Sequence, residues 1–355
     1  MSDRDRHAGS LPQVLSAAHV PSITPPSPPI SAESAIPQVR EKEKACTIRF
    51  RGAVAEIRRL ALVLAVATLL ASLCAQTAGA SQLIARNARG VKLEVNAKGI
   101  ALLTYRAQGH TQHVLAWGAI NAIAPTETRS QVAFRVDYSG GWGSQGYAVW
   151  KGFRNVCRPV QVPLAWLVTA CRTPDGSNWA LQRWQRHLLN YGLPSTGIHA
   201  AWELRLSHWK GPLPKLDIGV GWAYRRFHSL YGRYTYRGKP IFGFHSTPSG
   251  NPLDSFGRNV YVDTYNSAYG PGWHRENGFL THLNTGGFCY GFYPHGDRPS
   301  GMGERYRATV SGPGVLPDVT WEGAAPPLAY DRTFDLAADA AQRALLPDDH
   351  LCQPR

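Results

Sequence analysis

Apolar and polar residues alternate along many short stretches of this chain, and the alternation constrains its fold more than any other feature. Val91, Leu93 and Val95 are separated by Lys92 and Glu94. Side chains two residues apart in an extended chain point to the same side, so the pattern predicts a β-strand with one buried face. Similar patterns predict strands or hairpins at residues 132–138, 167–184, 203–207, 216–224, 234–244, 259–265 and 306–312.

One of these stretches allows a prediction of which side chains are buried. The inward side chains are expected to be those of Val132, Phe134, Val136 and Tyr138, and the outward ones those of Ala133, Arg135 and Asp137. Leu204 and Leu206 alternate with Glu203, Arg205 and Ser207, but alternation alone does not show which face is buried when two sheets pack.

Turn signals separate the predicted strands. The sequence NAKG at 96–99 and the segment Thr173–Ser177 are typical of hairpin turns. Many short strands with regular turns predict an all-β fold, in which antiparallel sheets form a sandwich or a barrel-like structure. We expect this β-rich domain to span residues 81–325, and a boundary near residues 208–215 would divide it into two β units.

A single stretch near the C-terminus has clear helical periodicity. Phe334, Ala338, Ala341 and Leu345 would share one face of a helix over 334–346, and Pro347 would end it. Residues 326–355 are therefore predicted to be a linker followed by a short helix.

The segment that precedes the β-rich domain resembles an export signal. Arg58 and Arg59 precede the apolar run Leu60–Cys74, and Ala78–Ala80 provide an A-x-A cleavage site. We interpret 54–80 as a signal-peptide helix that is removed after Ala80; a membrane anchor is the alternative. The protein would be secreted, periplasmic or on the cell surface, with no membrane span after cleavage.

Residues 1–53 are rich in Pro and Ser and fit a packed domain poorly. They are either a disordered leader or an untranslated region preceding a true start at Val54.

Four cysteines follow the predicted cleavage site. An even number of cysteines in an exported chain suggests two disulfides, and three pairings are possible. The short separation favours Cys157–Cys171, which leaves Cys289–Cys352 by elimination, with a free Cys352 as the alternative.

The chain carries a formal net charge of +14, and 10% of its residues are aromatic. A basic surface favours anionic partners, and exposed aromatic rings suit sugars. The sequence contains no nucleic-acid-binding motif, and we expect no nucleic-acid partner. The motif GWGSQG at 141–146 precedes an apparent strand, so we interpret it as a glycine-rich hairpin loop and expect no cofactor.

The segment 274–295 concentrates residue types that bind or react. Glu276 together with Asp263 would form the carboxylate pair of a glycoside hydrolase. Alternatively, His274, Glu276 and His282 would bind a metal ion. The ligand-binding candidates are Tyr265, Trp273, His274, His282, Tyr293 and His295.

The phrases GRNVYVDTYNSAYG (257–270) and LAWGAINA (115–122) complete a pattern of export signal, basic aromatic-rich β domain and cysteine pairs. In this pattern the chain resembles uncharacterised secreted β-rich proteins of high-GC, actinobacteria-like bacteria. That resemblance implies no activity and no site residues.

Three functions remain open. The first is non-enzymatic binding of an extracellular or cell-wall polymer, of carbohydrate type and in one version anionic. The second is a secreted polysaccharide hydrolase that uses the carboxylate pair or the metal set. The third is a structural surface protein.

Overall fold

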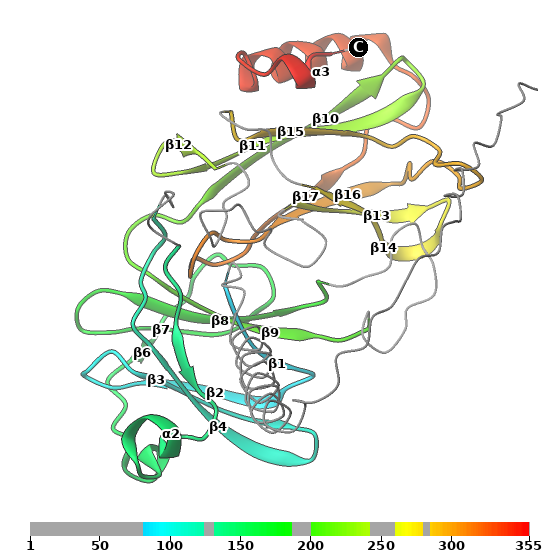
Figure 1. Ribbon diagram of the computed structural model, residues 1–355. Helices are drawn as coiled ribbons and strands as arrows, with labels where there is room; N and C mark the ends of the chain where they lie inside the picture. The colour runs from blue at the N-terminus through cyan, green and yellow to red at the C-terminus, as the bar shows by residue number, and fades with distance from the viewer. Residues whose placement is uncertain (1–80, 124–130, 187–199, 242–259, 280–284, 355) are drawn as a thin grey trace, which may run out of the picture. The chain divides into compact units, whose positions relative to one another are not determined.

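A computed structural model describes residues 81–123, 131–186, 200–241, 260–279 and 285–354 (Figure 1). The predicted leader and signal peptide, as well as His282, lie outside these residues. Within the described part, no helix is both long enough and apolar enough to cross a membrane.

The strands form four antiparallel sheets, named here I to IV. Sheet I contains β2 (Arg89–Val95), β3 (Ala101–Ala107), β4 (His110–Trp117) and β5 (Arg135–Asp137). Sheet II contains β1 (Gln82–Arg86), β9 (Glu203–Trp209), β8 (Asn178–Trp184), β7 (Leu167–Arg172) and β6 (Arg158–Pro159). Sheet III contains β14 (Gly270–Phe279), β13 (Val260–Ser267), β16 (Arg305–Val310) and β17 (Val319–Ala324). Sheet IV contains β10 (Lys215–Ala223), β11 (Phe227–Tyr236), β12 (Lys239–Pro240) and β15 (Gly287–Gly291).

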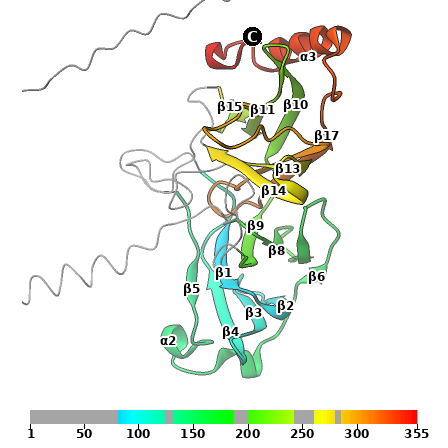
Figure 2. The same cartoon turned by 90° about the vertical axis from the view of Figure 1, so that its right-hand side faces the viewer.

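The sheets stack in the order I, II, III, IV, with the C-terminal helix outside sheet IV (Figures 1 and 2). Leu103 of sheet I and Trp179 of sheet II belong to one apolar core. Ala180, Tyr306 and Leu230 extend a second core across sheets II, III and IV. Each sheet is open, with two edge strands and no closure into a barrel. The all-β prediction is therefore confirmed, in its sandwich form.

Sheet II lies inside the stack, and this position changes the burial of its polar side chains. Glu203, Arg205 and Ser207 are each at most 1% exposed, so both faces of this alternating strand are buried. Their side of the sheet packs toward sheet III, where the Arg205 guanidinium lies 3.0 Å from the Glu203 carboxylate. The indole N–H of Trp184 donates to Asp318 across 2.8 Å. Buried charges of this kind require partners, and these have them.

The chain passes from sheets I and II to sheets III and IV between Trp209 and Lys215, in the segment where the sequence suggests a boundary. Trp209 nevertheless shares the second core with Leu230 and Val260. The two pairs of sheets are therefore joined by apolar packing, and not by the connecting segment alone.

Helix α3 (Arg332–Leu345) matches the predicted C-terminal helix, with Asp331 as its N-cap. It covers sheet IV, where the Tyr231 hydroxyl donates to the Ala338 carbonyl across 3.0 Å. Ala341, assigned to the buried face by its spacing, is exposed. Gln342 is buried instead, because its amide donates to the carbonyl of Cys352.

The favoured pairing of the four cysteines is confirmed: the structure contains the disulfides Cys157–Cys171 and Cys289–Cys352. The first joins the segment around β6 to β7 of sheet II. The second ties the C-terminal 3₁₀ turn η2 (His350–Cys352) to β15 of sheet IV. The C-terminal segment is thus part of the packed structure.

Candidate functional site

A β-bulge in strand β14 separates the predicted site residues onto two sides of sheet III. Val262 of β13 pairs with Asn277, whereas its neighbour Asp263 pairs with Arg275, so Glu276 is an extra residue. Arg275 reaches Asp263 and the backbone of Arg186, which follows sheet II. Glu276 instead faces Tyr290 of sheet IV. A bulge re-aims side chains in this way, and bulges are common near functional sites.

Asp263 is fixed between two arginines. Arg275 Nε donates to one carboxylate oxygen, and Arg307 donates to the other across 2.8 and 3.0 Å. Burial raises the pKa of Asp263, but the two guanidinium groups outweigh it and hold the pKa below its usual value. Asp263 is therefore a charged structural group, unsuited to donating a proton.

Glu276 is fully buried and belongs to a different cluster. Its Oε1 accepts from the Tyr290 hydroxyl across 3.0 Å, and that hydroxyl also lies 3.0 Å from Nε2 of His295. Burial raises the pKa of Glu276, and the hydroxyls of Tyr269 and Tyr290 offset part of the rise. The structure thus joins two predicted residues, Glu276 and His295, through Tyr290, which the sequence did not single out.

The carboxylate pair does not assemble around Glu276 in the described structure, and the metal set stays a prediction because His282 lies outside the described residues. Asp263 and Glu276 lie on opposite sides of sheet III, while both hydrolytic geometries require carboxylates that face one substrate. His274 Nε2 lies 3.1 Å from the carbonyl oxygen of Pro271. No group of three His, Cys, Asp or Glu side chains among the described residues has the arrangement of a metal site.

The predicted ligand-binding rings near sheet III are engaged by arginines. The guanidinium of Arg307 lies 4.2 Å from the ring centroid of Trp273, and that of Arg305 lies 5.6 Å from the ring of Tyr265. Both rings are half-buried. These cation–π contacts occupy ring faces that a sugar would need.

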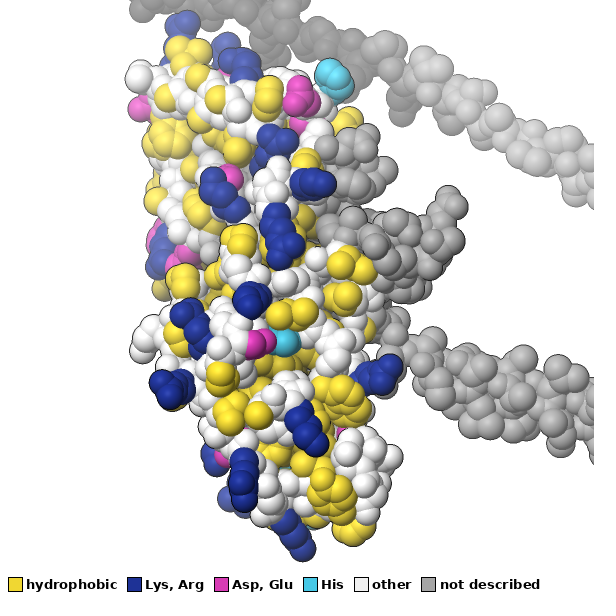
Figure 3. Space-filling model, turned by 90° about the vertical axis from the view of Figure 1, so that its left-hand side faces the viewer, with side chains coloured by type: hydrophobic (Ala, Val, Ile, Leu, Met, Phe, Trp, Pro, Cys, Tyr) yellow, Lys and Arg dark blue, Asp and Glu magenta, His cyan; other side chains and the backbone are white. Residues whose placement is uncertain are grey.

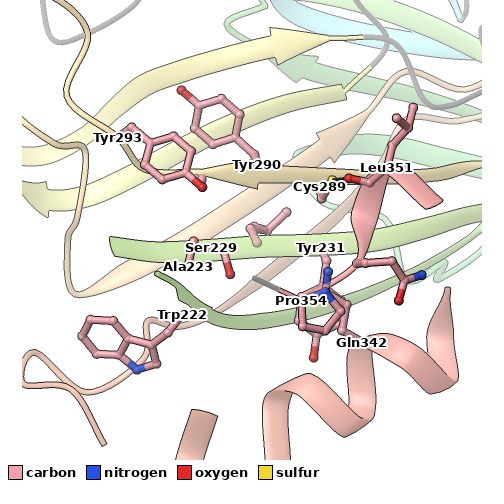
Figure 4. A pocket seen from close by; sticks show the side chains of 13 residues that line it. Trp222, Ala223, Ser229, Tyr231, Cys289, Tyr290, Tyr293, Gln342, Leu351 and Pro354 are labelled. Atoms are coloured by element: carbon pink, nitrogen blue, oxygen red, sulfur yellow. Dashed lines mark hydrogen bonds between the residues drawn. The ribbon is translucent and has the colours of Figure 1, made fainter. Parts of the chain in front are cut away.

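Tyr293 lines a pocket of about 190 Å³ beside the C-terminal segment (Figure 4). Leu351 and Pro354 close one side of it, and Trp222 and Tyr231 of sheet IV lie on the other. A space of this size is at the small end for a ligand site.

The exposed aromatic side chains gather elsewhere, in residues 138–153, here called the aromatic loop. Trp142 is 63% exposed and Tyr147 is 58% exposed. Tyr138 and Trp150 are exposed as well, so four of the seven exposed Trp and Tyr side chains of the described residues lie in this loop. A group of exposed rings of this kind is a candidate contact surface.

Asp137 holds the aromatic loop in shape. Its carboxylate accepts from the backbone N–H of Ser139 across 2.8 Å and of Ser144 across 2.9 Å, and from both hydroxyls. Burial raises the pKa of Asp137, but these hydrogen bonds together lower it to about 2. The prediction that Asp137 points outward and Tyr138 inward is therefore wrong, because Asp137 is buried by its hydrogen bonds to the loop and Tyr138 is exposed.

Two short helices form where the sequence suggested a hairpin loop and a strand. The motif at 141–146 contains helix α2 (Trp142–Gln145), and η1 (Val149–Gly152) follows. Gly141 has φ 114°, and a Cβ there would lie 2.4 Å from a methyl carbon of Val149. The ring of Trp150 stacks on His113 of β4 at 4.3 Å, which fastens the loop to sheet I.

Cationic side chains border the aromatic loop. A cavity of about 390 Å³ is lined by Tyr147 and Phe153 together with Lys98 and Arg154. Lys151 lies 5.6 Å from the Trp150 ring. On the face shown in Figure 3, Lys and Arg are spread over the described surface and Asp and Glu are sparse. Aromatic rings and positive charge therefore occur together at this end of sheet I.

The sequence contains a signal for the exposure of this loop. In GWGSQGYAVW the aromatic residues are embedded among glycines and lack the period of two that would bury them. Binding residues favour loops carried by a rigid scaffold, and here sheet I is the scaffold. Comparisons with protein-family models, with curated proteins and with solved structures found no family, no relative and no structure that matches this chain.

Proposed function

We propose that the protein binds an anionic, carbohydrate-type extracellular polymer through the aromatic loop, without cleaving it. The observation that carries the proposal is the concentration of exposed rings, above all Trp142 and Tyr147, beside the cationic cavity. Sugar rings stack on exposed indole and phenol faces, and acidic groups of the polymer would approach Lys98, Lys151 and Arg154.

The sequence placed the contact surface at residues 263–295, whereas the exposed rings favour the aromatic loop. Rings near Asp263 are covered by arginines, whereas Trp142 and Tyr147 present most of their surface to water. The separation of Asp263 from Glu276 gives no support to two-carboxylate hydrolysis.

The test is sedimentation of the purified protein with an insoluble anionic cell-wall polysaccharide and, in parallel, with an uncharged one. Replacement of Trp142 and Tyr147 by Ala should weaken binding about tenfold or more, because burial of a large apolar side chain contributes roughly 1.5–3 kcal/mol. Added salt should weaken binding to the anionic polymer alone.

Trp202→Ala is the matched control, since Trp202 is 43% exposed but lies outside the aromatic loop. Sugar released into the supernatant is measured in the same tubes. Equal sedimentation of the double variant and the parent protein, or release of sugar by the parent protein, would overturn the proposal.

A further inference from the structure

A serine and a histidine that polymer binding does not use lie together in a second cavity. Ser177 ends the turn before β8, and His208 lies on β9. Ser177 Oγ and His208 Nε2 are 2.9 Å apart. Both residues line a cavity of about 440 Å³, whose wall also includes Lys98.

The protonation of His208 follows from its partners. Its Nδ1 lies 2.6 Å from the carbonyl oxygen of Ala119, which can only accept, so Nδ1 carries the hydrogen. Burial lowers the pKa of His208 to about 4, although Ala119 and Asp175 act against the shift. At neutral pH the Nε2 is therefore unprotonated and can accept a hydrogen bond from the Ser177 hydroxyl. The Asp175 carboxylate is a second acceptor for that hydroxyl, also across 2.9 Å, so attack by Ser177 requires the hydroxyl to turn from Asp175 to His208.

The surroundings hold this pair in place. The ring of Trp179 stacks on His208 with centroids 3.8 Å apart and an interplanar angle of 15°. Thr173 Oγ1 lies 2.6 Å from Ser177 Oγ, and Asp175 accepts from the backbone N–H of Ser177 across 3.1 Å. A nucleophilic hydroxyl needs a base that is oriented by a third group, and the Ala119 carbonyl has that role here.

We propose that Ser177 is a nucleophile toward carboxylic esters with a short acyl group, and that His208 is its general base. Ser177 Oγ would form a bond to the carbonyl carbon while its proton moves to His208 Nε2. The carbon–oxygen bond to the alcohol then breaks, and Nε2 returns the proton to the leaving oxygen. Water attacks the resulting acyl-serine in the same manner, giving the carboxylic acid and restoring the hydroxyl.

The electrostatics of the wall fit this chemistry. Lys98 places a positive charge in the cavity, where negative charge would develop on the ester oxygen. The backbone N–H groups of the turn are already committed, with Gly176 donating to the Thr173 carbonyl and Ser177 to Asp175. Lys98 is therefore the group assigned to oxyanion stabilisation. Lys98 lines both this cavity and the one beside the aromatic loop, so ester cleavage and polymer binding would share that side chain, whereas Ser177 and His208 serve ester cleavage alone.

The test is labelling of the purified protein with a fluorophosphonate, followed by peptide mass spectrometry. Attack by Ser177 forms an oxygen–phosphorus bond and releases fluoride, which leaves a stable adduct. We expect the adduct on the peptide that contains Ser177, and faster release of p-nitrophenol from p-nitrophenyl acetate than with Ser177→Ala. His208→Asn should slow labelling about 100-fold or more.

Ser229→Ala is the matched control, because Ser229 lines the pocket beside the C-terminal segment shown in Figure 4. In this variant the fluorophosphonate should label Ser177 at the same rate as in the parent protein. Mass spectrometry of the labelled parent protein shows whether Ser177 carries the adduct, and this result tests the proposal even if His208→Asn does not fold. An unlabelled Ser177 in the folded parent protein would overturn the proposal, as would labelling of His208→Asn at the parent rate.

Discussion

The guanidinium of Arg307 lies 4.2 Å from the ring centroid of Trp273 and donates two hydrogen bonds to Asp263. Removal of this side chain would leave a buried carboxylate with Arg275 as its remaining charged partner. We expect Arg307→Ala to lower the free energy of unfolding by about 2–3 kcal/mol, the cost of losing hydrogen bonds to a buried charge. Urea denaturation of the parent protein and the variant measures this loss in the free energy of unfolding.

Arg305→Ala is the control for that variant. Arg305 is 49% exposed and pairs with Glu322 at the surface, where an ion pair contributes roughly 0–1 kcal/mol. A loss in Arg305→Ala as large as in Arg307→Ala would contradict the assigned role of the Arg307–Asp263 contact.

Asp137→Asn should loosen the aromatic loop, because an amide nitrogen cannot accept from Ser144. The expected loss is about 1–2 kcal/mol of stability, together with weaker sedimentation with the polymer. The pKa of Asp137 falls from 3.8 to about 2 on folding. The carboxylate therefore stabilises the protein fully above about pH 4, and this contribution disappears as the pH falls toward 2.

Thermal unfolding of parent protein and variant across that pH range checks this prediction. If the difference in stability between the parent protein and Asp137→Asn stayed constant down to pH 2, the Asp137 carboxylate would not be the stabilising group. Asp217→Asn is a suitable control, since Asp217 pairs with Lys215 at the surface of sheet IV.

Glu276 should show the opposite pH dependence. Because its pKa is raised on folding from 4.5, the folded protein retains a proton that the unfolded chain releases. Stability therefore decreases as the pH rises above 4.5. We expect Glu276→Gln to flatten this decrease and to be more stable than the parent protein at pH 7, because the buried amide carries no charge.

Chemical denaturation of the parent protein and Glu276→Gln at several pH values tests this pH dependence of stability. Glu304→Gln is the reference variant, because Glu304 is exposed. Polymer binding should remain unchanged in Glu276→Gln. A Glu276→Gln variant with the same pH profile as the parent protein would show that the carboxyl group is not the origin of the effect.

The two disulfides should contribute unequally to stability. Their sequence separations are 14 residues for Cys157–Cys171 and 63 residues for Cys289–Cys352. The chain-entropy estimate gives about 3 kcal/mol for the first and about 4 kcal/mol for the second. Thermal unfolding of the two double Cys→Ser variants should therefore show the larger loss for the second bridge. Equal losses would argue against a chain-entropy origin.

Much of the fold was predictable because local patterns determine strands. The alternation that ends at Val95 and the turn at Thr173–Ser177 are found as expected in β2 and in the β7–β8 hairpin. Burial was predicted correctly for Phe134 and wrongly for Asp137 and Tyr138, where the aromatic loop begins. For Glu203 and Arg205 the alternation showed two faces, but no local pattern indicates that a second sheet will cover the polar face.

The candidate site was harder to predict for a related reason. Strand alternation places Glu276 relative to its neighbours, but the bulge that separates it from Asp263 depends on pairing with another strand. Similarly, the exposure of Trp142 depends on Asp137, whose hydrogen bonds to Ser139 and Ser144 form only when the chain turns back. Sequence composition shows that aromatic residues are abundant, and only the fold shows which of them are exposed.

The central position of sheet II also bears on how the chain assembles. Sheets I and II are made from residues 82–209, so they are synthesised before sheets III and IV, which begin at Lys215. Until sheet III is made, the side of sheet II that will meet it presents Glu203 and Arg205. That side also carries Trp184 and Trp209, so a half-synthesised chain would present a mixed surface. The charged pair would make this surface less prone to aggregation than a purely apolar one.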